Sequence, residues 1–73
     1  NTILYGASWC GGCRRAKDYL EKNKIPYVYK DIDNDSIKSE FDTYGFKSVP
    51  LLVHNGETLL GFEVYKYDEI LKK

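Results

Sequence analysis

The sequence predicts an α/β domain with the element order β-α-β-α-β-β-α, in which a mixed sheet of four strands is flanked by three helices. Three observations favour this class. Short β-branched and aromatic runs alternate with segments whose apolar residues recur every three or four positions. Glycine and proline separate the segments, and an Asn-Gly pair, the strongest short-range hairpin signal, divides the last two runs. With no linker or internal repeat, the chain is predicted to form one domain over residues 1–73.

The first half of the chain has the pattern of a strand, a helix and a second strand. The run "TILY" at 2–5 suits a buried strand, which Gly6 ends. Residues 13–23 place apolar side chains at helical spacing and charged side chains on the opposite face. Pro26 cannot continue that helix, and "YVYKDI" at 27–32 is rich in strand-forming residues. The two strands are therefore predicted to pair in parallel through a right-handed crossover.

The second half of the chain predicts a helix, a hairpin and a closing helix. Candidate N-caps at 33–36 precede a helical apolar face that ends near a glycine. The runs at 49–54 and 57–60 flank the Asn-Gly turn and are predicted to pair antiparallel. Residues 64–71 again have apolar side chains at helical spacing. These elements complete the mixed sheet and its three helices.

Composition excludes several classes of function. Eleven basic residues balance eleven acidic ones, so the chain has no basic field to attract nucleic acid or an anionic membrane. Its apolar runs are far shorter than the roughly 20 residues that a membrane span requires. Two cysteines cannot form the multi-bridge framework of small secreted domains. We therefore expect a cytoplasmic monomer that binds neither nucleic acid nor membranes.

Both cysteines of the chain lie in "SWCGGC", directly after the first predicted strand. A disulfide closing so short a loop contributes only about 2 kcal/mol, which makes a structural clip unattractive. Zinc requires four ligands, and His54 is the only other soft candidate, so we expect no metal site in one chain. Thiol–disulfide exchange requires an attacking thiolate and a second thiol nearby. Because a helix N-terminus favours the thiolate, Cys10 is predicted to attack and Cys13 to resolve.

Neighbouring residues leave two questions open. Arg14, Arg15 and Lys17 place positive charge near the cysteines, which favours a thiolate, but a solvated outer helix face is the more common explanation of such residues. Trp9, the only tryptophan, either packs in the core or lies exposed beside Cys10, where it offers a substrate a flat apolar surface.

The cysteine pair after the first strand, "SVPLLV" at the third and "LLGFEVYKYDEIL" at the end together resemble the glutaredoxin family of the thioredoxin-like superfamily. The resemblance covers essentially the whole chain and implies a thioredoxin-like fold of glutaredoxin size. It implies a thiol-disulfide oxidoreductase that serves electron transport and cell redox homeostasis. It also implies a cis bond between Val49 and Pro50 that faces the cysteines, with the Val49 backbone pairing to substrate. The general preference of X-Pro bonds favours trans.

The resemblance divides between subfamilies. "WCGGC" is closer to the thioredoxin pattern, but Leu4 stands where thioredoxins have a buried acid. For glutathione contacts the family pattern implies Lys47 near the Val-Pro loop and the turn formed by Gly61, Phe62 and Glu63. Glutathione is then a reductant or co-substrate rather than a bound cofactor. The Gly-Phe pair also resembles small reductants of ribonucleotide reductase, some of which are themselves reduced by thioredoxin reductase.

Two other functions remain open at this point. Some glutaredoxins form dimers around an iron-sulfur cluster held with glutathione, and the unobstructed Gly-Gly pair leaves room for one. A non-enzymatic interaction module with incidental cysteines is the other alternative. The favoured prediction is a dithiol-disulfide oxidoreductase whose substrates are disulfide-containing proteins or glutathione mixed disulfides.

Overall fold

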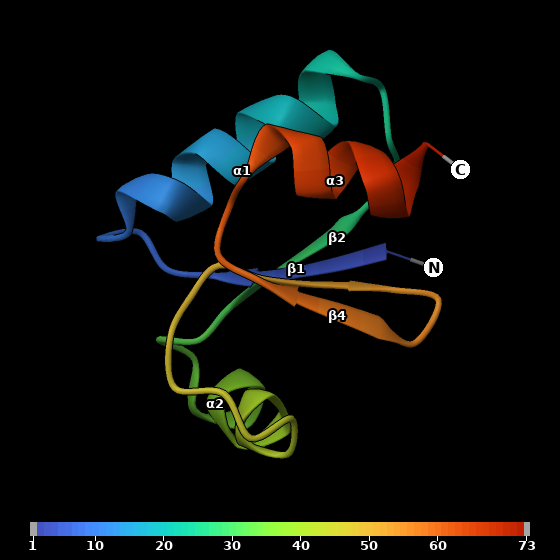
Figure 1. The fold of residues 1–73 in the computed structure, drawn as a ribbon. Helices are drawn as coiled ribbons and strands as arrows, with labels where there is room; N and C mark the ends of the chain where they lie inside the picture. Colours follow the sequence, from blue (N-terminus) through green and yellow to red (C-terminus); the bar gives the residue numbers. More distant parts are fainter. Residues whose placement is uncertain (1, 73) are drawn as a thin grey trace.

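The computed structural model describes residues 2–72, so Asn1 and Lys73, the ends of the predicted domain, lie outside the described residues. The elements follow the predicted order: β1 (Thr2–Gly6), α1 (Gly11–Lys22), β2 (Val28–Asp31), α2 (Asp35–Asp42), β3 (Leu51–His54), β4 (Glu57–Leu60) and α3 (Val64–Leu71). Figure 1 shows α1 and α3 on one face of the sheet and α2 on the other. The predicted α/β architecture, a thioredoxin-like fold with four strands and three helices, is confirmed.

The sheet has the strand order β2-β1-β3-β4, which places β1 in its interior. β1 pairs in parallel with β2, where Leu4 lies opposite Tyr29, and antiparallel with β3, where Leu4 lies opposite Leu52. The β3–β4 hairpin turns at Asn55 and Gly56, whose φ angles are 50° and 86°. Asparagine and glycine tolerate these positive values better than other residues do, which explains why this pair marks the turn.

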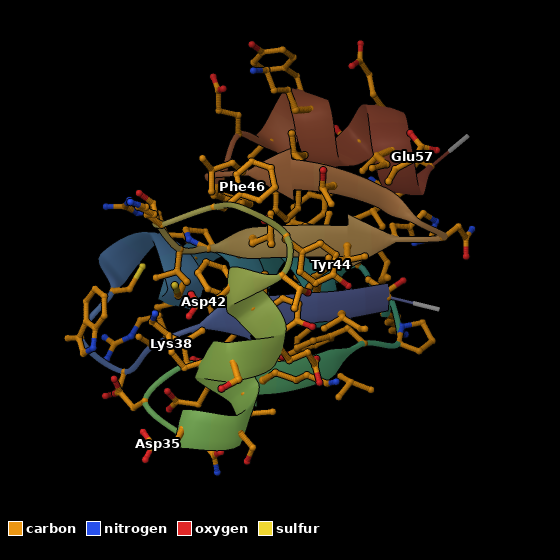
Figure 2. The ribbon with its side chains drawn as sticks, turned by 90° about the horizontal axis from the view of Figure 1, so that it is seen from below. Asp35, Lys38, Asp42, Tyr44, Phe46 and Glu57 are labelled. Atoms are coloured by element: carbon orange, nitrogen blue, oxygen red, sulfur yellow. The ribbon has the colours of Figure 1, made fainter. Side chains whose placement is uncertain are left out.

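Two apolar clusters, one on each face, hold the helices to the sheet. Alternate side chains of a strand point to opposite faces of the sheet. Leu4 therefore packs on the face covered by α1 and α3, whereas Tyr5 packs on the face covered by α2. Figure 2, seen from below, shows α2 lying across its face of the sheet. The cluster under α1 and α3 contains Leu4, Ala16, Tyr19, Leu20, Leu52 and Tyr67. The cluster under α2 contains Tyr5, Phe41, Leu51 and Val53.

Helix α1 begins at Gly11, two residues before the apolar periodicity that starts at Cys13. Cys10 is its N-cap, and the Sγ atom of Cys10 accepts a hydrogen bond from the Cys13 backbone N–H at 3.2 Å. Gly11 and Gly12 have no apolar side chains, so hydrophobic periodicity cannot register the first turn. The second helix likewise ends at Asp42, before Tyr44, although the Tyr44 ring still packs on the core beside Tyr5.

Gly6 sets how closely α1 approaches the sheet at the end of β1. A Cβ atom at this position would lie 2.9 Å from Cε1 of Tyr29 and 3.1 Å from Cβ of Cys13. Both separations are shorter than van der Waals contact, so a larger residue would push α1 or the tyrosine ring outward. The glycine therefore allows the cysteine pair to lie directly above β1 and beside β2.

In the described part of the chain, no helix is both long enough and apolar enough to cross a membrane.

Candidate active site

The two cysteines occupy different environments although they are one helical turn apart. Cys10 is half-buried at the N-terminus of α1, whereas Cys13 is only 1% exposed. Both are free thiols. The Cys10 Sγ atom lies 3.2 Å from the backbone nitrogen of Cys13 and 3.6 Å from the carbonyl oxygen of Val49. The site thus contains one accessible sulfur that accepts a backbone N–H bond and one sulfur withdrawn from solvent.

Burial also lowers the acidity of the Cys13 thiol. The pKa of Cys13 is raised from 9.0 to about 12, chiefly by desolvation and then by its hydrogen-bonding contact with Cys10, against a smaller lowering by the Ala7 backbone. Cys13 is therefore a protonated thiol at neutral pH. A protonated, buried thiol is a weak nucleophile toward a bulky substrate. Because Cys13 is one helical turn from Cys10, it can still attack a mixed disulfide formed on Cys10.

Val49 and Pro50 lie beside the cysteines, and the bond between them is cis. The family resemblance implies this isomer, although X-Pro bonds in general favour trans. The Pro50 ring packs against α1, because its Cδ atom lies 3.3 Å from where a Cβ atom on Gly12 would be. The Pro50 carbonyl accepts a hydrogen bond from Gly61 N–H at 2.8 Å, which ties the Val-Pro loop to the end of β4.

The remaining predicted contact residues surround the cysteine pair at different places. Trp9 is 68% exposed, and its indole N–H donates to an Asp33 carboxylate oxygen at 3.2 Å, so the core alternative for Trp9 is wrong. Phe62 is half-buried, and its ring packs edge-on against Tyr19 and Tyr67.

Lys47 and Glu63 are both exposed. Lys47 lines a cavity of about 430 Å³ between α2 and the segment 45–47 that follows it. Glu63 is the N-cap of α3 and pairs with Lys66 at 3.3 Å. Of the residues implied by the resemblance, the structure brings Val49 and Pro50 to the cysteine pair, and Gly61 is bonded to Pro50. Phe62 packs its ring into the core cluster under α1 and α3.

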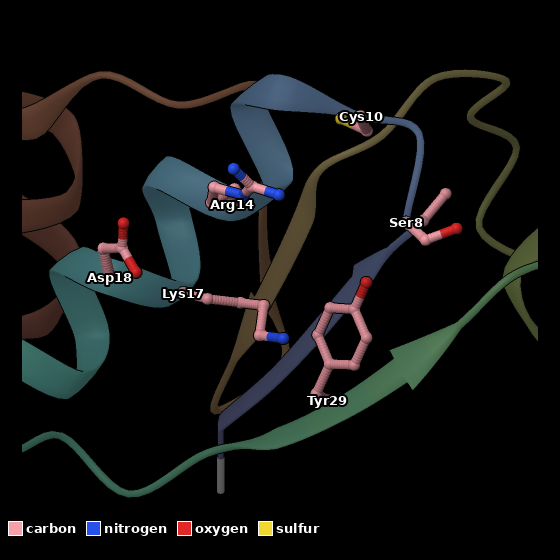
Figure 3. A pocket seen from close by; sticks show the side chains of 7 residues that line it. Ser8, Cys10, Arg14, Lys17, Asp18 and Tyr29 are labelled. Carbon is pink, nitrogen blue, oxygen red and sulfur yellow. The ribbon is translucent and has the colours of Figure 1, made fainter.

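A pocket of about 390 Å³ opens beside Cys10 on the β2 side (Figure 3). Sequence reasoning missed four of its lining residues, Ala7, Ser8, Asp18 and Tyr29, as parts of a site. Tyr29 reaches the pocket because β2 pairs in parallel with β1, and no local pattern predicts that register. The lining residues are Ala7, Ser8, Cys10, Arg14, Lys17, Asp18 and Tyr29.

The zinc hypothesis finds no support in the positions of its ligands. His54 is the last residue of β3, at the end of the strand away from Pro50, and its Nδ1 atom lies 2.8 Å from the Thr2 hydroxyl. Within residues 2–72, no three side chains of His, Cys, Asp or Glu gather closely enough to hold a metal ion.

Comparison with known protein families identifies the family of this chain. The family model described as Glutaredoxin matches residues 2–59. The chain belongs to the glutaredoxin family.

Relatives of this glutaredoxin include proteins of two kinds. It is 36% identical over 56 residues to the global transcriptional regulator Spx 2 of Bacillus anthracis, which covers 77% of this chain and 40% of the relative. It is 42% identical over 38 residues to a putative glutaredoxin of Mycobacterium tuberculosis, covering 52% of this chain and 45% of that protein. The chain thus spans less than half the length of these curated relatives.

Solved structures share the thioredoxin-like fold over nearly the whole chain. A mutant of a thioredoxin-like protein is 26% identical, with a TM-score of 0.90 over 97% of this chain and 94% of that one. A glutaredoxin from Archaeoglobus fulgidus is 24% identical, with a TM-score of 0.88 over 99% and 86%. The NrdH-redoxin of Escherichia coli is 17% identical, with a TM-score of 0.81 over 94% and 92%. The last two likenesses concern the fold alone.

The two glycines between the cysteines predict opposite effects of the same substitution. A Cβ atom at Gly11 meets nothing within 4 Å, whereas one at Gly12 meets Pro50 at 3.3 Å. We expect Gly11→Ala to stabilise the fold by about 0.4–1 kcal/mol, because alanine reduces the entropy of the unfolded chain. We expect Gly12→Ala to be neutral or destabilising by about 1 kcal/mol, because it displaces the Pro50 ring.

Urea unfolding of both variants, kept fully reduced, measures this difference. Each variant is the control for the other, since both add the same methyl group to the first turn of α1. Equal stabilisation by both substitutions would contradict the close contact between Gly12 and Pro50.

Proposed function

We propose that this glutaredoxin is a dithiol-disulfide oxidoreductase that reduces disulfides of proteins or mixed disulfides of glutathione. The asymmetry of the cysteine pair carries the proposal: an accessible Cys10 at a helix N-terminus stands one turn from a buried, protonated Cys13. An attacking sulfur must reach the substrate, whereas a resolving sulfur must be shielded from it. The two environments match these two requirements.

In the first step, the Cys10 thiolate attacks one sulfur of the substrate disulfide. The Cys10–substrate bond forms, the substrate S–S bond breaks, and the other substrate sulfur leaves as a thiolate that takes up a proton. The backbone N–H of Cys13, 3.2 Å from Sγ, stabilises the negative charge before attack. Ionisation of Cys10 also removes its hydrogen bond to the Val49 carbonyl, which frees that oxygen for a substrate backbone N–H.

In the second step, Cys13 loses its proton and attacks the Cys10 sulfur. The Cys10–Cys13 disulfide forms, the mixed disulfide breaks, and the second substrate sulfur leaves as a thiol. Two electrons have then passed from the protein to the substrate. A further two electrons from glutathione or from thioredoxin reductase must restore the dithiol.

Electron donors distinguish the glutathione-dependent and the reductase-dependent forms of this activity. The experiment measures reduction of insulin and of hydroxyethyl disulfide, first with glutathione and then with thioredoxin reductase as the electron source. Exposed Lys47 beside the Val-Pro loop offers a carboxylate-binding cation and supports glutathione as donor, so we expect faster turnover with glutathione. Turnover with neither donor, for either substrate, contradicts the proposal.

An iron-sulfur cluster shared between two copies is the second candidate. The observation that favours it is the open space at Gly11, which leaves the approach to Cys10 unobstructed. Such a cluster would take Cys10 from each copy and the thiols of two glutathione molecules as ligands. Visible absorbance that scales with iron in anaerobically purified protein supports this candidate, and a colourless monomer contradicts it.

A further inference from the structure

We propose that the pocket on the β2 side of Cys10 is a subsite for an acidic side chain one or two residues from the target cysteine of a protein disulfide. The inference rests on the proposed function and adds a substrate preference to it. The subsite consists of Ser8, Arg14, Lys17 and Tyr29, and Cys10, which attacks the substrate, also lines the pocket (Figure 3).

The topology brings these side chains together from three elements. Ser8 comes from the loop after β1, and Tyr29 comes from β2. Arg14 and Lys17 are three residues apart on α1, so they lie on one face of the helix. Figure 3 shows Lys17 and Tyr29 on facing sides of the pocket, with Cys10 and Ser8 at one end.

The two basic groups of the pocket have no carboxylate partner in residues 2–72. The Lys17 ammonium group lies over the Tyr29 ring, 4.3 Å from its centroid, and the Arg14 guanidinium forms no ion pair. Elsewhere in the described chain, Lys38 and Lys66 each pair with an acidic residue of their own helix or its cap. The positive charge beside Cys10 is therefore available to a substrate.

The spacing along α1 sets which substrate residue reaches the subsite. Arg14 is one helical turn from Cys10, a rise of about 6 Å, and adjacent residues of an extended peptide are about 3.8 Å apart. A peptide whose cysteine meets Cys10 thus brings a side chain one or two positions away to Arg14. Asp18 lies a further turn along the pocket and adds a negative charge at its far end, so the acidic residue must lie close to the cysteine.

Tyr29 supplies a neutral donor to the same group. Burial, with Asp31 and both cysteines adding to it, raises the pKa of Tyr29, so its hydroxyl remains protonated and able to donate. On the other side of Cys10, the Val49 carbonyl lies 3.6 Å from the sulfur. A substrate backbone on the Val49 side leaves the pocket free to receive a side chain.

Peptide mixed disulfides that differ only beside the cysteine test the inference. Three peptides carry Glu, Gln or Lys next to the cysteine, and each is joined to the same chromophoric thiol, whose release is followed. We expect the wild type to reduce the Glu peptide about fivefold faster than the Gln peptide, the size of an exposed ion pair. The R14Q/K17Q double variant is expected to bring this ratio close to one.

Arg15→Gln is the matched control, since Arg15 is an exposed cation on α1 that does not line the pocket. We expect it to retain the Glu preference. An equal fall in all three rates for R14Q/K17Q overturns the inference, because the cations would then act on the Cys10 thiolate and not on the substrate.

Glutathione mixed disulfide is the fourth probe, since its carboxylates carry the same charge. Loss of rate for that probe alone in R14Q/K17Q overturns the inference in favour of a small-molecule subsite. A wild type that reduces all four probes without a preference for Glu over Gln overturns the inference and leaves the proposed function standing. A wild type inactive on all four overturns both.

Discussion

Cys10→Ser is expected to abolish disulfide reduction, whereas Cys13→Ser is expected to stop the reaction after its first step. Serine cannot form the thiolate that attacks a disulfide, so the rate with Cys10→Ser should equal that without protein. Serine is also a preferred N-cap residue, and its hydroxyl can accept the Cys13 N–H bond that Sγ now accepts. The fold of α1 is therefore retained in this variant.

Cys13→Ser gives the complementary result. Cys10 remains accessible and attacks, but no second thiol displaces the substrate, so a mixed disulfide on Cys10 accumulates. Mass spectrometry of the trapped species identifies the cysteine, and circular dichroism of both variants controls for folding. Full activity of Cys10→Ser would contradict the redox mechanism. A mixed disulfide that forms on Cys13 in the Cys10→Ser variant, with none on Cys10 in Cys13→Ser, would show that the two cysteines have the opposite roles.

The sequence predicts the fold well where local signals are strong. The turn at Asn55 and Gly56 and the break before Pro26 each depend on the backbone preferences of one or two residues. The structure has its hairpin turn at the first place, and α1 ends at Lys22, before the proline. The start of α1 is the exception. Its first turn contains two glycines, so the apolar periodicity does not reach it. Only the short loop after the first strand predicts that Cys10 lies at or just before this turn, and in the structure Cys10 is the N-cap.

The site divides in the same way. The cysteine pair can be predicted from the sequence because both sulfurs come from one short segment. The approach of Tyr29 to Cys10 depends instead on the parallel register of β1 and β2 and on the absence of a side chain at Gly6. Phe62 shows the converse: a residue placed near substrate by family resemblance turns its ring toward Tyr67, because burying an aromatic ring stabilises the core.

Stability is expected to fall in alkaline solution earlier than ionisation of the tyrosines alone allows. The pKa of Cys13 is raised from 9.0 to about 12 by burial, so the unfolded chain loses this proton first. The stability that the neutral thiol contributes is complete below about pH 9 and is lost as the pH rises toward 12. Linkage gives a loss of about 1.4 kcal/mol by pH 10 in the free energy of unfolding.

Urea titrations of the reduced protein between pH 7.5 and 10 measure this slope, with Cys13→Ala as the control. Burial also raises the pKa values of Tyr5, Tyr19, Tyr27, Tyr29 and Tyr67, which begin to destabilise the fold as the pH approaches their ordinary value of 10.0. The contribution of the thiol is therefore the difference between the wild-type and Cys13→Ala curves, since both proteins keep the five tyrosines. Parallel curves for wild type and Cys13→Ala would mean that Cys13 ionises as easily in the folded protein as in the unfolded chain. The protonation that shields Cys13 from direct attack would then be absent, and only burial would distinguish the resolving sulfur from the attacking one.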